Sequence, residues 1–210
     1  VVFAGCGGRW LSLHSIPQLP RGPFMALTPS SMLPIGTSAP DFLLPDTVSE
    51  RDLGFSDVAG ERGTLIMFIC NHCPYVIHVR EELVRLASDY LPRGIGCAAI
   101  SSNDIGLYPK DGPEQMAQLA AKIGMPFPYL FDAAQDVARA YQATCTPDFF
   151  LFDAAGELSY RGRLDAATPG NGVPVTGRDL RDAMDALLAG QRLPEEEQLP
   201  SMGCNIKWAA

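Results

Sequence analysis

Short runs of apolar residues, bounded by glycine, proline and polar residues, predict strands along the chain. The first run, residues 64–70, is too short and too rich in β-branched residues for a lone helix, so it indicates a buried strand. A turn at residues 153–156 joins the last two strands into an antiparallel hairpin. The predicted strands cover residues 64–70, 95–101, 127–131, 148–152 and 157–161.

Between these strands lie segments in which apolar residues recur at three- and four-residue spacing, which predicts amphipathic helices. The order strand, helix, strand, helix implies right-handed parallel crossovers and therefore an α/β sheet. Ahead of them, the proline-rich residues 33–44 predict an extended edge segment that leads into a short hairpin. Residues 46–63 predict a turn, a short helix and a second turn. The predicted helices cover residues 74–91, 113–123, 134–141 and 177–188.

The length and charge of the chain limit the kinds of protein and partner that the sequence fits. A chain of 210 residues suits one domain with decorations, which we place at residues 33–208. Sixteen basic and 24 acidic side chains give a net charge of −8 without any long Lys/Arg cluster, which argues against a nucleic-acid partner. No apolar stretch approaches the roughly 20 residues that span a bilayer, so we expect no membrane span and a cytoplasmic protein.

Residues 1–32 are expected to form an N-terminal extension outside this domain. Residues 1–24 show no helix or strand periodicity and precede Met25, a natural start, which favours a misassigned start or an added extension. The alternative is that Phe-Ala-Gly-Cys at residues 3–6 ends a bacterial lipoprotein signal. Cys6 would then carry the lipid and anchor an exported protein.

The candidate chemistry lies in Cys70-Asn71-His72-Cys73-Pro74, where the first buried strand gives way to a helix. Pro74 suits the first helical position, because its missing N–H costs nothing there. Cys73 then occupies the N-cap. Free amide groups and the positive end of the helix dipole stabilise a thiolate at that position, and the thiolate is the nucleophile in cysteine redox chemistry. The pattern therefore favours a redox dithiol in which Cys73 attacks and Cys70 resolves, and the alternative is the reverse order, in which Cys70 attacks first.

Two other interpretations of the CxxC remain open. One is a copper or zinc carrier with Cys70, Cys73 and His72 as ligands, since thiolate and imidazole suit these metals. Cys145, Cys204 or His78 would also be available to complete such a site. The other is a pair of ordinary buried cysteines. Cys97, inside an apolar run, is expected to be inert strand packing.

The order of elements resembles the thioredoxin fold with an insertion between its halves, and Cys145-Thr146-Pro147 strengthens that resemblance. In thioredoxin-like proteins a Thr-Pro or similar dipeptide precedes the hairpin, with a cis proline packed against the dithiol. The resemblance implies this role for Pro147, supported by Thr146. An ordinary trans proline at a strand entry is the alternative.

A nearer resemblance is to the peroxiredoxin-like group of the thioredoxin superfamily, whose members join an alkyl-hydroperoxide-reductase-type scaffold to Asn-His-Cys-Pro in the active-site turn. It implies an α/β thioredoxin fold and no cofactor. The reductant would be a thioredoxin-like protein or a low-molecular-weight thiol, and the substrate a disulfide or a small peroxide. The matching segments are residues 35–42, 70–76, 101–104, 145–153 and 201–208.

The sequence departs from peroxiredoxins proper, which carry Pro-x-x-x-Thr-x-x-Cys and a distant arginine. Cys73 takes the attacking place, but Cys70 stands where the threonine belongs and Ile66 where the proline belongs. No arginine occurs at residues 145–152, near the family's position. A peroxide's leaving oxygen needs hydrogen bonds in the transition state. We therefore expect a thiol-disulfide oxidoreductase using Cys70 and Cys73. The alternative is a thiol peroxidase with Cys73 peroxidatic and Cys70 resolving.

Three further residues have secondary roles in this hypothesis. Cys145, if Pro147 lies beside the dithiol, is either a resolving thiol, a metal ligand or a small buried residue. Cys204 is placed in a turn near the end of the chain, from which a flexible tail folds back as a resolving arm. His72 either tunes the neighbouring thiolate through its charge at mildly acidic pH or is exposed at the turn.

Overall fold

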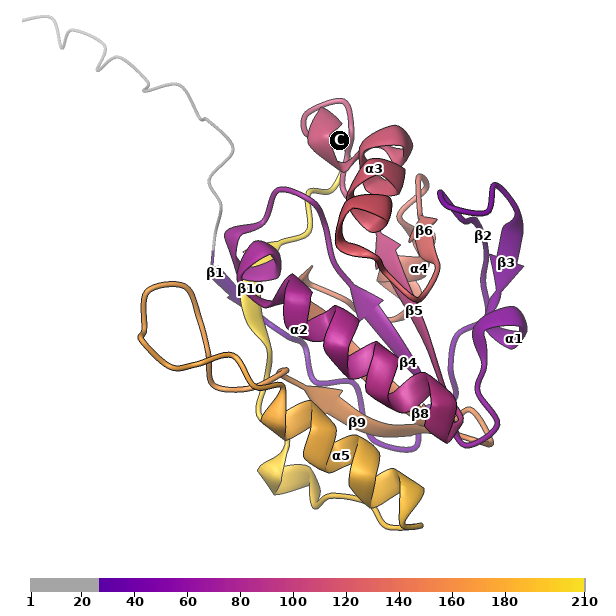
Figure 1. The fold of residues 1–210 in the computed structure, drawn as a ribbon, viewed down its shortest axis with the longest axis vertical. Coiled ribbons are helices and arrows are strands. Elements are labelled where there is room, and N and C mark those ends of the chain that lie inside the picture. Colours follow the sequence, from indigo (N-terminus) through magenta and orange to yellow (C-terminus); the bar gives the residue numbers. More distant parts are fainter. Residues whose placement is uncertain (1–26, 210) are drawn as a thin grey trace, which may run out of the picture.

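A five-stranded mixed sheet forms the centre of the computed structural model, which describes residues 27–209 (Figure 1). Its strands run in the order β6-β5-β4-β8-β9. The pairs β4–β5 and β5–β6 are parallel, whereas β4–β8 and β8–β9 are antiparallel. The strands are β4 (Gly63–Phe68), β5 (Ile95–Ser101), β6 (Tyr129–Phe131), β8 (Asp148–Asp153) and β9 (Leu158–Gly162).

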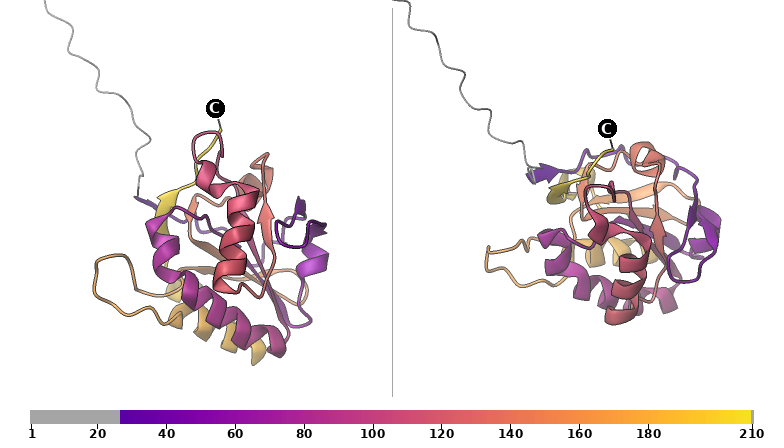
Figure 2. Two further views of the ribbon diagram at one scale, coloured as in Figure 1. Left: turned by 45° about the horizontal axis from the view of Figure 1, so that its top comes forward. Right: turned by 90° about the horizontal axis from the view of Figure 1, so that it is seen from above.

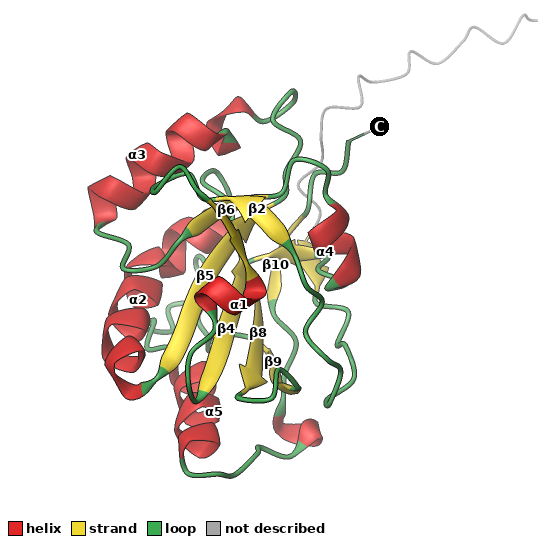
Figure 3. Ribbon diagram, turned by 90° about the vertical axis from the view of Figure 1, so that its right-hand side faces the viewer, coloured by secondary structure: helices red, strands yellow, loops and turns green. Residues whose placement is uncertain are grey.

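Helices cover both faces of this sheet, as Figures 2 and 3 show from three further directions. On one face, α2, α3 and α5 pack on Leu65 and Met67 of β4. On the other face, Ile66 and Phe68 pack against the N-terminal segment and α4. This alternation within β4 follows from the two-residue period of a strand. The helices are α1 (Phe55–Val58), α2 (Pro74–Tyr90), α3 (Pro113–Ile123), α4 (Asp136–Ala140) and α5 (Arg178–Leu188).

A small antiparallel sheet joins the two ends of the described chain at the rim of the molecule. It has the order β1-β10-β7 and is built from β1 (Leu27–Pro29), β10 (Met202–Asn205) and β7 (Cys145–Thr146). A separate hairpin pairs β2 (Leu43–Pro45) with β3 (Asp52–Gly54). Short 3₁₀ turns complete the fold: η1 (Leu91–Arg93), η2 (Pro109–Asp111) and η3 (Glu195–Glu197).

The α/β class and the central mixed sheet flanked by helices are confirmed, with strands and helices close to their predicted ranges. The three strands of the small sheet, β1, β7 and β10, were not predicted. Because β1 pairs with β10, ordered structure begins before residue 33, where we placed the start of the domain. The interpretations of residues 1–24 and of Cys6 fall outside the described residues. Within those residues, no helix is both long and apolar enough to cross a bilayer.

Candidate active site

The dithiol lies in the turn that follows β4 and opens α2. Pro74 is the first residue of α2 and Cys73 is its N-cap, with extended backbone angles of φ −65° and ψ 123°. Cys70 and Cys73 are 1% and 0% exposed, and both are free thiols. The local structure therefore places Cys73 as expected, at the positive end of a 17-residue helix.

The cis-proline segment lies directly against both sulfur atoms. The Thr146–Pro147 peptide bond is cis, as the resemblance to thioredoxin-like proteins implied. The Cys73 thiol donates to the carbonyl oxygen of Thr146 over 3.2 Å, and Cys70 Sγ lies 3.4 Å from the Thr146 hydroxyl. Thr146 thus touches both members of the pair.

Strand β10 brings a third thiol to the site. Cys204 is opposite Thr146 in the register of β10 with β7, and it is buried rather than carried on a flexible arm. The expectation of a turn at residues 203–205 is therefore wrong. A Cβ atom on Gly203 would overlap the carbonyl oxygen of Thr146, so glycine is what allows β10 to approach the cis-proline segment so closely.

The neighbours of Cys73 favour its ionisation over that of the two other thiols. Hydrogen bonds from the Cys204 thiol, from the Cys70 thiol and from backbone N–H groups lower the pKa of Cys73 to about 2, against the effect of burial. Donation to Cys73, together with burial, raises the pKa of Cys70 and of Cys204. Cys73 is consequently the most readily ionised of the three.

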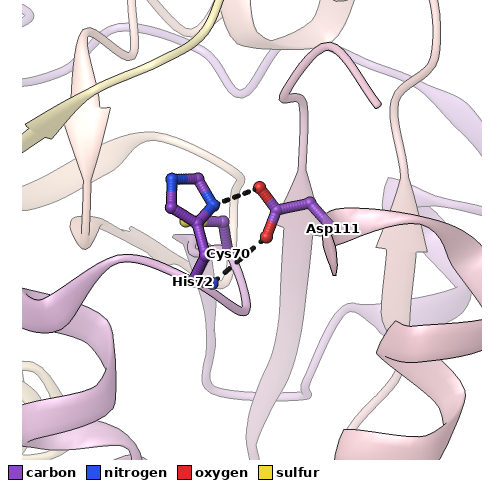
Figure 4. A group of neighbouring side chains, drawn as sticks. All are labelled: Cys70, His72 and Asp111. Carbon is purple, nitrogen blue, oxygen red and sulfur yellow. Dashed lines mark hydrogen bonds and ion pairs between the residues drawn. The ribbon is translucent and has the colours of Figure 1, made fainter. Parts of the chain in front are cut away.

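Asp111, at the end of η2, holds the dithiol turn from the other side. Its Oδ1 accepts the N–H groups of Asn71 at 2.8 Å and His72 at 3.2 Å. Its Oδ2 accepts Asn103 Nδ2 at 2.9 Å and lies 2.6 Å from His72 Nδ1 (Figure 4). The His72 ring stacks on Tyr108, with centroids 4.6 Å apart. His72 is therefore fixed in place, with a side chain 13% exposed.

The positions of these side chains differ from those expected of the copper or zinc site with Cys70, Cys73 and His72 as ligands. Among the described residues, the one group of His, Cys, Asp and Glu side chains close enough to share an ion is Cys70, His72 and Asp111, without Cys73. The 2.6 Å between His72 Nδ1 and Asp111 Oδ2 is a hydrogen-bond length, whereas two ligands of a zinc ion at about 2 Å stand roughly 3 Å apart. His78 is exposed on α2. The geometry favours a hydrogen-bonded network over a ligand set.

Cys145 and the buried Arg161 have other contacts than the two dithiol sulfur atoms. Burial raises the pKa of the Cys145 thiol, which contacts the carbonyl oxygen of Pro147 at 3.7 Å. Arg161 of β9 lies with its guanidinium 5.0 Å from the ring centre of Phe150 and 3.7 Å from Asp148 Oδ2. Burial raises the pKa of Asp148 to about 6, although Arg161 opposes the shift. Arg161 therefore serves a buried ion pair.

A dithiol at a strand-to-helix turn, facing a cis proline across the end of a mixed sheet, places the chain among thioredoxin-fold proteins. Residues 35–161 match the AhpC/TSA family, and the chain belongs to that family.

Similar proteins have been solved and named in bacteria. An uncharacterized conserved protein from Geobacillus kaustophilus is 51% identical, with a TM-score of 0.86, covering 89% of this chain and 98% of its own. A hypothetical protein from Sinorhizobium meliloti 1021 is 45% identical, with a TM-score of 0.84, covering 87% and 99%. The thiol-disulfide oxidoreductase ResA of Geobacillus kaustophilus (strain HTA426) is 28% identical over 134 residues, 62% of this chain and 70% of ResA.

Sequence reasoning located Cys70, Cys73, His72 and Pro147 but missed Asp111, Asn103 and Tyr108. These three lie in or beside the loop at residues 102–112, for which no periodic pattern exists. The one available signal was Ser101-Ser102-Asn103-Asp104, which was among the segments that carried the family resemblance.

Proposed function

We propose that this protein is a thiol-disulfide oxidoreductase in which Cys73 attacks a disulfide and Cys70 resolves the product. The observation that carries the proposal is the state of Cys73, a buried N-cap sulfur that receives hydrogen bonds from two neighbouring thiols and lies beside the cis proline. Family membership and the similarity to ResA support the same reaction class.

The reaction takes place in two exchanges. Cys73 thiolate attacks R–S–S–R′, so that a bond to the R sulfur forms and R′S⁻ leaves. Cys70 then attacks Cys73 Sγ, which gives a Cys70–Cys73 disulfide and releases the second thiol. A thioredoxin-like protein or a low-molecular-weight thiol would reduce this disulfide and restore the dithiol.

Substrate is expected to approach beside Pro147. A cavity of about 80 Å³ lies there, lined by Tyr75 and Val79 of α2, Pro147, Leu164 and Met202. Cys73 itself is 0% exposed, so β10 or the cis-proline segment must shift for a substrate sulfur to reach Sγ. The cavity supplies apolar contacts next to that point of entry.

Trapping tests the assignment of the two roles. Reduced Cys70→Ser protein treated with oxidised glutathione is expected to accumulate a stable mixed disulfide at Cys73, because the resolving thiol is absent. Mass spectrometry of tryptic peptides locates the adduct, and Cys97→Ser protein, which keeps both thiols, should form the Cys70–Cys73 disulfide instead. A glutathione adduct on Cys70 in Cys73→Ser protein, but none on Cys73 in the Cys70→Ser protein, would reverse the roles. A Cys73–Cys204 disulfide in Cys70→Ser protein would make Cys204 a second resolving thiol.

A further inference from the structure

In the second exchange, Cys70 must lose its thiol proton before or while it attacks Cys73. The Cys70 thiol is buried, and hydrogen bonding to Cys73, burial and the charge of Asp111 all raise its pKa. Once Cys73 is part of a mixed disulfide, its thiolate charge is gone, but burial and Asp111 still disfavour a Cys70 thiolate. Resolution at neutral pH therefore needs a proton acceptor close to Cys70.

The His72–Asp111 pair lies in that position. Cys70 Sγ, one ring nitrogen of His72 and a carboxylate oxygen of Asp111 all lie within 4.8 Å of one another (Figure 4). The two nitrogens of an imidazole ring are about 2 Å apart, so both lie within roughly 7 Å of Cys70 Sγ, and one water molecule together with a rotation of the thiol connects the thiol to either of them. Both groups come from the segments that meet at the dithiol turn, so their distance from Cys70 is set by the fold.

The hydrogen bonds of Asp111 fix the state of the His72 ring. Asp111 is 0% exposed and accepts two backbone N–H groups and Asn103 Nδ2 in addition to His72. A carboxylate is an acceptor, so Nδ1 carries the proton of the 2.6 Å bond. Nε2 is then the basic nitrogen, and among the described residues this buried atom has no hydrogen-bond partner.

We propose that His72, oriented by Asp111, accepts the proton of Cys70 while Cys70 attacks the mixed disulfide on Cys73. This inference rests on the proposed function. In the step, the Cys70–Cys73 bond forms, the bond from Cys73 to the R sulfur breaks, and R leaves as RS⁻. The Cys70 proton moves to His72, and Asp111 stabilises the resulting imidazolium. The imidazolium then gives this proton to RS⁻, which diffuses away as RSH.

Other ionisable groups near the His72–Asp111 pair belong to several different elements. Tyr129 of β6, whose pKa burial raises, donates to Asn71 Oδ1 over 3.1 Å. Tyr108 stacks on the ring, and Lys207 Nζ lies 5.6 Å from the ring centre of Tyr108 and bonds to Asn205. The Cys204 and Cys70 thiols, in turn, form hydrogen bonds with Cys73. Asp111 is the residue that bonds directly to His72 Nδ1.

Stopped-flow kinetics with 4,4′-dithiodipyridine separate the two exchanges, because each releases one thiopyridone. His72→Gln in the full chain is expected to leave the first release within about twofold of wild type. The second release should slow at least about tenfold at pH 7, since a positioned acid–base group contributes roughly 10²-fold or more. In the variant, the second rate should rise about tenfold per pH unit, because hydroxide replaces the imidazole, whereas the wild-type rate should depend less steeply on pH.

The matched control is His78→Gln, which removes an exposed histidine from the same end of α2 and should leave both releases unchanged. An unchanged second release in His72→Gln protein overturns the proposal. A parallel slowing without the steeper pH dependence also overturns it, because that result indicates a structural role. If His72→Gln does not fold, Asp111→Asn is the second variant, with the same expected slowing. A wild-type protein that releases only one thiopyridone contradicts the proposed function itself.

Discussion

Replacing Cys73 by serine is expected to lower the rate of disulfide exchange by at least about a thousandfold, as loss of a nucleophile does in other covalent mechanisms. Cys73 is the thiol whose pKa is lowered, to about 2, whereas hydrogen bonding to Cys73, together with burial, raises the pKa of Cys70 and of Cys204. Cys70 cannot replace it readily, since Asp111 and burial still oppose ionisation of Cys70 when Cys73 is absent. Thiolate, rather than thiol, performs the attack.

The rate is measured from the loss of a chromogenic disulfide by the reduced protein. Cys97→Ser is the control, because Cys97 is buried in β5 and burial raises its pKa to about 12. It should react at the wild-type rate. Retention of more than a tenth of the activity in the Cys73→Ser protein would mean that another thiol starts the reaction.

Removing the Cys204 thiol is expected to raise the pKa of Cys73 by about one to two units. The Cys204 side chain is the largest cause of the lowered pKa, and a hydrogen bond to a charged group contributes about 1.5–3 kcal/mol, with 1.36 kcal/mol for each pKa unit. Cys204→Ala removes this donor. Cys204→Ser keeps a hydroxyl donor in the same place and should stay within about half a unit of wild type.

The sign of the pH effect follows from the direction of the shift. A lowered pKa keeps Cys73 as thiolate down to acidic pH, so the alkylation rate by iodoacetamide should change little as the pH falls from 7 to 4 in wild type. In Cys204→Ala protein the rate should begin to fall at a pH one to two units higher than in wild type. Equal profiles for the Ala and Ser variants would show that the Cys204 thiol does not stabilise the thiolate.

Much of the fold was predictable because its elements carry strong local patterns. The all-apolar run of β4 and the regular spacing along α2 each determine an element without reference to the rest of the chain. Pro74 fixed the start of α2 and hence the N-cap position of Cys73. The proline at residue 147 came from the family resemblance.

The parts of the site that were not predicted from the sequence depend on tertiary contacts. Strand β10 has four residues, Met-Gly-Cys-Asn, with no alternation of apolar and polar positions, and its pairing with β7 spans more than fifty residues. Asp111 lies forty residues from Asn71, so the bond between them leaves no local trace. Long-range pairs of this kind are invisible to periodicity, and they bring Cys204 and Asp111 to the dithiol.

The structure also shows whether other residues replace the threonine and arginine of peroxiredoxins, which this sequence lacks at the family's positions. Arg161 is buried, but it lies over Phe150, which belongs to the core cluster on the face of the sheet opposite Cys73. The Thr146 hydroxyl lies near Cys70 Sγ, at 3.4 Å. Neither residue supplies the hydrogen bonds that a peroxide's leaving oxygen requires at Cys73. The arrangement is better suited to a disulfide, whose leaving group is a stable thiolate.

The most direct test of thiol-disulfide exchange is the second-order rate of hydrogen peroxide reaction with the reduced, metal-free protein, measured beside its reaction with a disulfide donor. Peptide mapping then identifies the cysteines that become linked. We predict a slow peroxide reaction, together with ready formation of the Cys70–Cys73 disulfide from the donor. A fast peroxide reaction that is lost in Cys73→Ser protein would contradict this account and establish a peroxidase.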